Sequence, residues 1–437
     1  MSETEGPQHN RIKMHTNPIV YVLVALFGSA SWLSTNAVWM ELPLLTHSLP
    51  EHWALPSYLA LIVQIACIGP LVYSILTKCC GITLSAPGLI FALLLLCTIS
   101  EFGLAFLWSV TMHIFGSYHS VALYLFMFIL ALVNSTSNVL FMPYMATFHP
   151  SYLTAYFVGM GFSSLYPSVV SLLQGSYTYE CRYDPIQNAT SPIFLSPRFS
   201  FEVYTVAMGC WLAMTLVSFS LLHFFHDYFA NLGREPADNL EVEPKEDSPL
   251  KGTQPTETQS DTTDRSSQKR YIILSFCLAF ICAQMNAVVP SVQSYATMSY
   301  SLITYHLALA LSSLAHPIAS FLPLWVQPKK LNQLVGLTIA ATIGCTIIFI
   351  MATQSPDPIG RSTIYGNGFA IVISIVTAFL HAYARTVLTS TIREDTPQNE
   401  NRLFWCGAFM QIGSFLGALI MFPLVNFSGI FTQAYLC

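Results

Sequence analysis

Charged residues are scarce in this chain. Only 9% of its 437 residues are Asp, Glu, Lys or Arg, whereas 54% are hydrophobic, and the net charge is -5. A soluble domain carries about 25% charged residues, so this composition excludes a soluble globular protein. The net charge gives no indication of nucleic-acid binding, and we expect no nucleic-acid partner. We predict an integral membrane protein that has the lipid bilayer as its surroundings.

The motifs of soluble enzymes and of metal sites are missing too. The sequence contains no P-loop, no HExxH, no GxSxG and no paired intramembrane Asp motif. Its 11 cysteines form no CxxC pair and no Cys/His spacing that indicates a metal. We therefore expect neither an enzyme nor a resident cofactor or metal.

Long apolar runs fill most of the chain. A run must cross about 30 Å of hydrocarbon to span a bilayer. Runs of this length occur at about 19–44, 55–76, 86–112, 121–148, 151–176, 200–227, 271–294, 300–325, 332–353, 366–392 and 403–430. The first run is too long for a signal peptide and lacks a cleavage site, so we expect it to stay as a membrane helix. The predicted fold is an all-α membrane protein with eleven spans, six before a polar break and five after it.

The polar break divides the chain into two helical halves. Residues 229–269 are rich in Asp, Glu, Pro, Ser, Thr and Gln, which is typical of a disordered linker. Around it we predict an N-terminal tail at 1–18, a first half at 19–228, a second half at 270–431 and a C-terminal tail at 432–437. Lys and Arg of the short loops fall mostly on the side of the N-terminus, which predicts a cytoplasmic N-terminus. An odd number of spans then places the C-terminus outside.

The loop at 177–199 is predicted to be extracellular. It contains the sequon Asn188-Ala189-Thr190, which makes Asn188 a candidate glycosylation site. Cys181 in this loop and Cys437 are both predicted outside, and the sequence leaves open whether they are bridged.

The first span ends in an aromatic and polar stretch, ASWLSTNAVWMELP. Trp32, Asn36 and Trp39 are spaced at i, i+4 and i+7, so on a helix they share one face. Two flat rings with an amide between them suit a flat ligand with polar edges. Glu41 points elsewhere, just before Pro43 interrupts the helical hydrogen bonding. An interfacial aromatic belt, with Glu41 reaching the headgroups, is the alternative interpretation.

Polar residues inside other spans are further candidates, because they are costly in lipid. In the fourth span, Asn134, Asn138 and Phe141 repeat the i, i+4, i+7 spacing. Hydrogen bonding between helices is the alternative role for the two amides. Gln174 lies near the outer end of the fifth span.

The seventh span carries the stretch AQMNAVVPSVQSY, in which Asn286, Pro290 and Gln293 share a face. Pro290 frees backbone carbonyls in mid-membrane, as in the broken helices that transporters place at substrate sites. Tyr295 closes this segment, and an interfacial position is as consistent with it as ligand contact.

The tenth span contains Tyr383 and Arg385. An arginine in mid-span must be paired or face water. Arg385 is therefore a candidate for ligand contact or for a gate pair, with Glu41 or Glu101 as partners. Glu101, in the third span, fits either a proton site or a structural carboxylate.

Six blocks of the sequence together resemble the eukaryotic riboflavin transporters. In chain order they are WLSTNAVWMELP, LPSYLALIVQIACIGPL, NVLFMPYMATFHPSYLTAYFVGMGFSSLYPSVVSLLQG, VVPSVQSY, YHLALALSSLAHP and LFWCGAFMQIGSFLGA. The resemblance covers about residues 19–430 apart from the linker and some loops. It implies a plasma-membrane carrier of riboflavin with eleven transmembrane helices. The implied architecture is similar to that of the equilibrative nucleoside transporters, a 6+5 version of the major-facilitator arrangement with pseudo-symmetric halves.

The motifs of the first, fourth and seventh helices carry over residue by residue. The matching positions are Trp32, Asn36, Trp39, Glu41, Asn138, Phe141, Asn286, Pro290 and Gln293. Arg385 and Asn134 have no anchor in the family pattern, so their roles rest on the physical argument. Riboflavin has a flat tricyclic ring for stacking, an imide edge suited to amides, and a ribityl chain of hydroxyls.

The predicted function is therefore riboflavin transport by alternating access, with two halves that rock around a central site. A carrier of nucleosides or of another flat heterocycle, and a multi-span receptor that does not transport, are the alternatives. The sequence fixes neither a coupling ion nor an oligomeric state.

Overall fold

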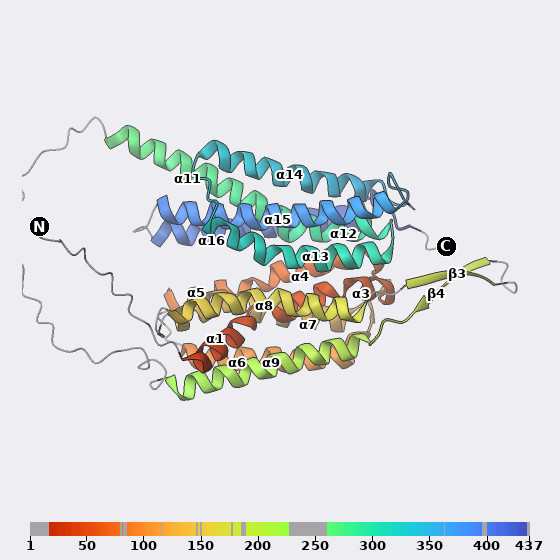
Figure 1. The fold of residues 1–437 in the computed structure, drawn as a ribbon, viewed down its shortest axis with the longest axis horizontal. Coiled ribbons are helices and arrows are strands. Elements are labelled where there is room, and N and C mark those ends of the chain that lie inside the picture. The colour runs from red at the N-terminus through yellow and green to blue at the C-terminus, as the bar shows by residue number, and fades with distance from the viewer. Residues whose placement is uncertain are drawn as a thin grey trace, which may run out of the picture.

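The computed structural model describes residues 17–434 except 79–80, 82–84, 115, 146, 149–150, 176–177, 185–188, 227–259, 362 and 396–399. Its long helices run roughly along one axis (Figure 1). In the part of the chain that is described, ten helices are long and apolar enough to cross a membrane, or eleven if a bent pair at the start counts as one span. The prediction of an all-helical, multi-span membrane protein is confirmed.

The helices before residue 227 form a first helix group. They are α1 (Pro18–Ser29), α2 (Leu33–Met40), α3 (Leu42–Ser48), α4 (Leu55–Ala66), α5 (Ile68–Lys78), α6 (Ala86–Leu107), α7 (Val121–Met145), α8 (Ser151–Gln174) and α9 (Phe201–Phe224). Figure 1 shows this group, coloured red to lime, along one side of the molecule.

The helices after residue 259 form a second helix group, coloured green to blue in Figure 1. They are α11 (Ser260–Ala283), α12 (Val289–Met298), α13 (Leu302–Phe321), α14 (Leu331–Thr353), α15 (Ile364–Asp395) and α16 (Glu400–Phe427). The helix α11 begins at Ser260, inside the predicted linker, and its membrane-spanning part begins at Gln268. A helix already formed in a span extends outward more readily than a new helix starts.

The first span is broken twice. A bend of 54° separates α1 from α2, and α2 ends before α3 at Glu41. The sequence predicts only the second break, at Pro43. At the first break the hydroxyl of Ser137 donates to the backbone carbonyl of Ser31, at 3.3 Å, which gives that oxygen a partner.

Glycines let α1 and α8 approach backbone to backbone. A Cβ at Gly159 would overlap the carbonyl of Ala25, and one at Gly28 would overlap the carbonyl of Tyr156. Close approach of this kind is the usual role of small residues between membrane helices. The small residues around Gly159 thus act in packing.

A π-helical turn over Gln284–Val288, here called the π-turn, joins α11 to α12. Pro290 explains it, because a proline ring clashes with the carbonyl four residues earlier in a regular helix, here that of Asn286. Widening the helix removes the clash. Turns of this type are frequent at functional sites.

Two antiparallel hairpins lie between spans: β1 (Met112–Ile114) with β2 (Ser117–His119), and β3 (Thr178–Asp184) with β4 (Ala189–Leu195). The second extends from one end of the bundle (Figure 1), which we call the hairpin end. Cys181, on β3, is disulfide-bonded. Asn188 and Cys437 lie outside the described residues.

The buried apolar side chains form two clusters. The larger one fills the first helix group and continues into the second through residues such as Tyr295, Tyr305 and Phe431. The smaller one lies within the second group. Since Tyr295 and Phe431 lie toward the hairpin end of their spans, the shared core joins the two groups there.

Candidate functional site

One face of α2 is more open than the rest of that helix. Trp32, Asn36 and Trp39 are half-buried, whereas the other positions of α2 are buried. This burial pattern agrees with the shared face that the spacing predicts, and Trp32 is the N-cap of α2. The helix α2 packs against α7 and α8 of its own group and also contacts α13 of the second group.

Hydrogen bonds hold this face in place but leave part of it unused. The Trp32 indole donates to Oδ1 of Asn138 at 3.3 Å, and Nδ2 of Asn36 donates to the carbonyl of Ser163 at 3.2 Å. The other half of each amide, Oδ1 of Asn36 and Nδ2 of Asn138, has no hydrogen bond to a described residue. The face thus offers two indole rings, one acceptor and one donor.

The structure separates the three candidates of the fourth span. Asn138 is exposed, whereas Asn134 and Phe141 are each 0% exposed. The side chain of Asn134 hydrogen-bonds with Ser34 on α2, and the ring of Phe141 packs 4.5 Å from that of Phe27. In this structure Asn138 alone of the three is open to a ligand, because α2 and α1 cover the other two positions.

Glu41 and Gln174 pair with each other. Nε2 of Gln174 donates to a carboxylate oxygen of Glu41 at 3.4 Å and to the carbonyl of Phe199 at 3.2 Å. Glu41 is 3% exposed and Gln174 is 2% exposed. Both side chains are therefore buried inside the first helix group near the hairpin end, and neither is part of the open face of α2.

Arg385 does not form a gate pair with Glu41 or Glu101. Ion pairs among the described residues involve His119–Glu51, Arg270–Asp395, Lys329–Glu394 and Arg361–Asp357. Arg385 is half-buried on α15, Glu41 pairs with Gln174, and neither carboxylate oxygen of Glu101 has a hydrogen-bond partner. Arg385 therefore has no acidic partner among the described residues.

The π-turn presents amides from the second helix group. Nδ2 of Asn286 donates to the hydroxyl of Ser414 at 2.9 Å, and its Oδ1 has no partner among the described residues. Gln284 donates to the hydroxyl of Thr342 at 3.0 Å, and its Oε1 lies 3.0 Å from Nε2 of His381. The half-buried Asn286 is therefore open to a ligand, whereas Gln284 is held on both sides.

The remaining candidates act within the second helix group or at its edge. Nε2 of Gln293 donates to the hydroxyl of Ser374 at 2.8 Å, and the hydroxyl of Tyr383 donates to the carbonyl of Val326 at 2.6 Å. Both side chains are buried. The bond of Gln293 joins α12 to α15, and the bond of Tyr383 joins α15 to the segment after α13.

Polar and aromatic contacts join the two helix groups along one seam, between α4 and its neighbours α12 and α16. From the hairpin end inward these are Ser294 to the carbonyl of Trp53 at 2.7 Å, Asn426 to Ser57 at 2.9 Å and Gln411 to Gln64 at 2.9 Å. Ring contacts accompany them, Trp53 with Tyr295 at 5.8 Å and Tyr58 with Phe422 at 4.9 Å. Among described residues, hydrogen bonds and ring contacts between the groups thus run from the hairpin end to the level of Gln64.

Sequence reasoning missed these seam residues. Gln64 and Gln411 carry the same signal as the chosen candidates, a polar side chain in an apolar span, and were overlooked. Trp53 has no local signal, because its role depends on a partner in α12.

Each of the two broken helices contacts a helix of the other group. The helix α2 contacts α13, and the π-turn contacts α4. No cluster of metal-binding side chains occurs in the described part of the chain. Indole rings and half-free amides suit a flat, neutral ligand with both donors and acceptors.

Two packed helix groups with broken helices at their junction define a multi-span membrane carrier of major-facilitator-like fold. A bacterial homologue of the human lysosomal transporter Spinster superimposes with a TM-score of 0.53 at 13% identity, over 92% of this chain and 82% of that one. The POT family transporter PepTSo gives a TM-score of 0.56 at 13% identity, over 95% of this chain and 91% of that one. At these identities the likeness concerns the fold alone.

The chain belongs to solute carrier family 52, riboflavin transporter, whose profile matches residues 16–433. It is 42% identical to riboflavin transporter rft-1 of Caenorhabditis elegans, over 97% of this chain and 100% of that protein. It is 32% identical to human solute carrier family 52, riboflavin transporter, member 3, over 96% of this chain and 98% of that protein.

Proposed function

We propose that this protein carries riboflavin across the plasma membrane by alternating access. The observation that carries the proposal is the half-buried α2 face of Trp32, Asn36 and Trp39 at the junction of the two helix groups. Its support is membership of the riboflavin transporter family over nearly the whole chain. Transport, and no chemical conversion, is the function of such a site.

The substrate fits the groups that are still free on this face. The tricyclic ring stacks on Trp32 or Trp39, where aromatic stacking contributes about 1–3 kcal/mol per ring. The imide edge presents an N–H between two carbonyls, which match Oδ1 of Asn36 or Asn286 and Nδ2 of Asn138. A neutral ligand of this kind needs no charged partner in the site.

The other candidates take supporting roles in this proposal. The pair of Glu41 and Gln174 holds the end of α2, and Asn134 holds α2 through Ser34. Phe141 packs against Phe27 of α1. Gln293 and Tyr383 form hydrogen bonds within the second helix group. Arg385 lies half-buried on α15. Tyr295 belongs to the seam at the hairpin end.

The architecture we propose is eleven transmembrane helices in pseudo-symmetric halves of six and five, joined by a cytoplasmic linker. The N-terminus is cytoplasmic, and the hairpin end and the C-terminus are extracellular. Supporting this, the cations Arg270 and Lys329 lie at the end opposite the hairpin, where they pair with Asp395 and Glu394, as the positive-inside rule requires. In this proposal the seam closes the extracellular side.

Alternating access requires that this closure be weak. A neutral hydrogen bond contributes only about 0.5–1.5 kcal/mol net, so breaking the three seam bonds is within reach of a bound substrate that favours the other state. A carrier for nucleosides or another flat heterocycle has the same architecture and is the runner-up. A non-transporting receptor would bind without moving its ligand.

The test is uptake by the purified chain reconstituted in sealed vesicles. Labelled riboflavin should accumulate inside, and the label should leave when a pore-forming agent opens the vesicles. Label that stays bound after the vesicles are opened would instead identify a receptor.

A further inference from the structure

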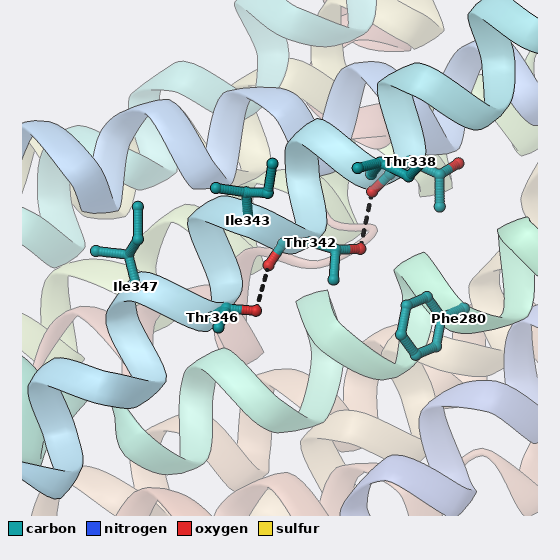
Figure 2. A pocket seen from close by; sticks show the side chains of 7 residues that line it. Phe280, Thr338, Thr342, Ile343, Thr346 and Ile347 are labelled. Carbon is teal, nitrogen blue, oxygen red and sulfur yellow. Dashed lines mark hydrogen bonds between the residues drawn. The ribbon is translucent and has the colours of Figure 1, made fainter.

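A groove of about 320 Å³ lies between α11 and α14, on the outer surface of the second helix group (Figure 2). Its lining residues come from the middle of α14 and one turn of α11, and they are Phe280, Thr338, Ile339, Thr342, Ile343, Thr346 and Ile347. Its volume falls in the range of about 300–1,000 Å³ that is usual for small-molecule sites. It shares no residue with the proposed riboflavin site.

The groove offers no free hydroxyl donor to a polar ligand. The three threonine hydroxyls each donate to the carbonyl four residues earlier, from Thr338 to Leu334, from Thr342 to Thr338 and from Thr346 to Thr342, at 2.8–3.0 Å. Figure 2 shows the last two of these bonds. No charged side chain lines the groove. With three isoleucines and a phenylalanine among its seven lining residues, the groove suits an apolar occupant.

The groove is continuous with the surface that meets the bilayer. Both helices are candidate spans. Phe280, Ile339 and Ile343 of the groove are 44%, 55% and 56% exposed, and Phe276 and Ile350 beyond its rim are 70% and 49% exposed. A soluble protein rarely exposes such a surface, whereas a membrane protein covers it with lipid. The hydrocarbon chains of bilayer lipids are the apolar groups present at this depth.

We propose that the groove is a specific binding site for one acyl chain of a membrane phospholipid. One lining residue, Thr342, connects the groove to the π-turn. Its hydroxyl accepts a hydrogen bond from Gln284, which is the first residue of the π-turn and also contacts His381. The acyl chain therefore packs against Thr342, whose hydrogen bond to Gln284 sets the distance between α14 and the π-turn.

This placement connects the lipid to the transport site, and that part rests on the proposed function. Asn286 lies on the same π-turn as Gln284. A chain that fills the groove holds α11 and α14 at the separation in which Gln284 reaches Thr342. Occupancy thus favours one geometry of the π-turn and alters the rate of riboflavin uptake.

The direct test needs no transport. The full chain is reconstituted in vesicles with a trace of phosphatidylcholine that carries a photoreactive diazirine in mid-chain, irradiated, and digested for mass spectrometry. We expect the label to concentrate on Phe280 and on residues 339–347.

Two matched variants sharpen this test. Ile343→Phe fills the groove, whereas Ile350→Phe makes the same change seven residues later, on the same face of α14 and at similar exposure. The first should lose the groove label and the second should keep it. Equal labelling along all lipid-facing helices, or groove label that survives Ile343→Phe, would overturn the site.

A sterol bearing the same photoreactive group serves as the competing occupant. If the sterol labels the groove and the phospholipid does not, the acyl-chain assignment is wrong. If labelling behaves as expected but Ile343→Phe and Ile350→Phe take up riboflavin at equal rates, the lipid site stands and its link to transport is overturned. Absence of riboflavin uptake by the parent chain, with the label in place, contradicts only the proposed function.

Discussion

The hydroxyl of Ser294 donates a 2.7 Å hydrogen bond to the backbone carbonyl of Trp53, 241 residues earlier in the sequence. This bond joins the two helix groups. Ser294 is 0% exposed and Trp53 is 6% exposed. The Trp53 ring also contacts Tyr295, which contacts Phe431. Of the three hydrogen bonds of the seam, this one lies nearest the hairpin end, which the seam holds closed. Access from that side requires this seam to open.

Locking the seam should stop transport. The side chains of Ser57 and Asn426 meet at 2.9 Å across the two groups. We expect the double variant Ser57→Cys with Asn426→Cys, treated with a short bifunctional thiol reagent, to lose riboflavin uptake, because the outward-facing state is no longer reachable. Cleaving the crosslink should restore uptake.

The control pair lies within the second group. The hydroxyls of Ser299 and Ser355 are 2.9 Å apart near the same end, so the double variant to cysteine should crosslink without loss of uptake. The parent chain, treated in the same way, corrects for its own cysteines. Full uptake by the crosslinked Ser57/Asn426 variant would contradict a moving seam.

Removing an indole from the α2 face should weaken binding. Stacking on an aromatic ring contributes about 1–3 kcal/mol, so Trp39→Ala should raise the KM for riboflavin roughly 5- to 150-fold, with normal amounts of protein at the surface. Trp39→Phe keeps a ring and should keep most of the affinity.

Trp325→Ala is the control, because Trp325 is 77% exposed at the end of α13 and touches no part of the site. Its KM should match that of the parent. An unchanged KM in Trp39→Ala would remove the α2 face from the site.

The close contact of α1 with α8 predicts a sharp difference between two neighbouring glycines. A Cβ at Gly159 overlaps the backbone of Ala25, whereas one at Gly161 meets only Pro317 at 4.0 Å. Gly159→Ala should lower stability by about 1–3 kcal/mol, the usual effect of overpacking, and Gly161→Ala should be nearly neutral. Thermal unfolding in detergent measures both, and equal melting temperatures would argue against this helix contact.

A buried carboxylate ties two loops at the hairpin end. Glu51 accepts hydrogen bonds from the backbone N–H and hydroxyl of Ser120, at 2.7 and 2.6 Å, and from the hydroxyl of Tyr124 at 2.6 Å. Glu51→Gln turns a donor toward these donors and should lower stability by about 1.5–3 kcal/mol, the range for bonds to a charged group.

Asp357→Asn serves as its comparison. Asp357 is 79% exposed in a surface pair with Arg361, and such pairs contribute at most about 1 kcal/mol. Its melting temperature should stay near that of the parent. A larger loss in Asp357→Asn than in Glu51→Gln would reverse the expected ranking.

The orientation can be checked on the loop between α8 and α9. If the hairpin end is extracellular, Asn188 is glycosylated in cells, and Asn188→Gln should increase mobility on gels to that of enzymatically deglycosylated parent. Unchanged mobility would leave the proposed orientation without this support.

Local periodicity predicted what depends on one helix. The span expected at 332–353 is α14 at Leu331–Thr353, because apolar runs of this length have no other stable place. The shared face of Trp32, Asn36 and Trp39 also follows from helical spacing alone. The break near Pro290 was predicted for the same reason, since a proline acts on its own backbone.

What depended on distant partners was not predictable. Asn134 has the same spacing signal as Asn138, but only the tertiary structure shows that Ser34 covers it. The bend between α1 and α2 has no proline to mark it. A gate pair with Glu41 or Glu101 was one of two alternatives for Arg385, yet Glu41 is taken by Gln174. Each outcome is decided by packing between helices, which a single sequence does not encode locally.

The most direct test of the central claim is competition for uptake in sealed vesicles that contain the purified chain. Labelled riboflavin should enter saturably, excess unlabelled riboflavin should abolish its entry, and excess uridine should leave it unchanged. Block by uridine as strong as that by riboflavin would identify a broader heterocycle carrier. No entry, with folded protein in the vesicles, would contradict riboflavin transport itself.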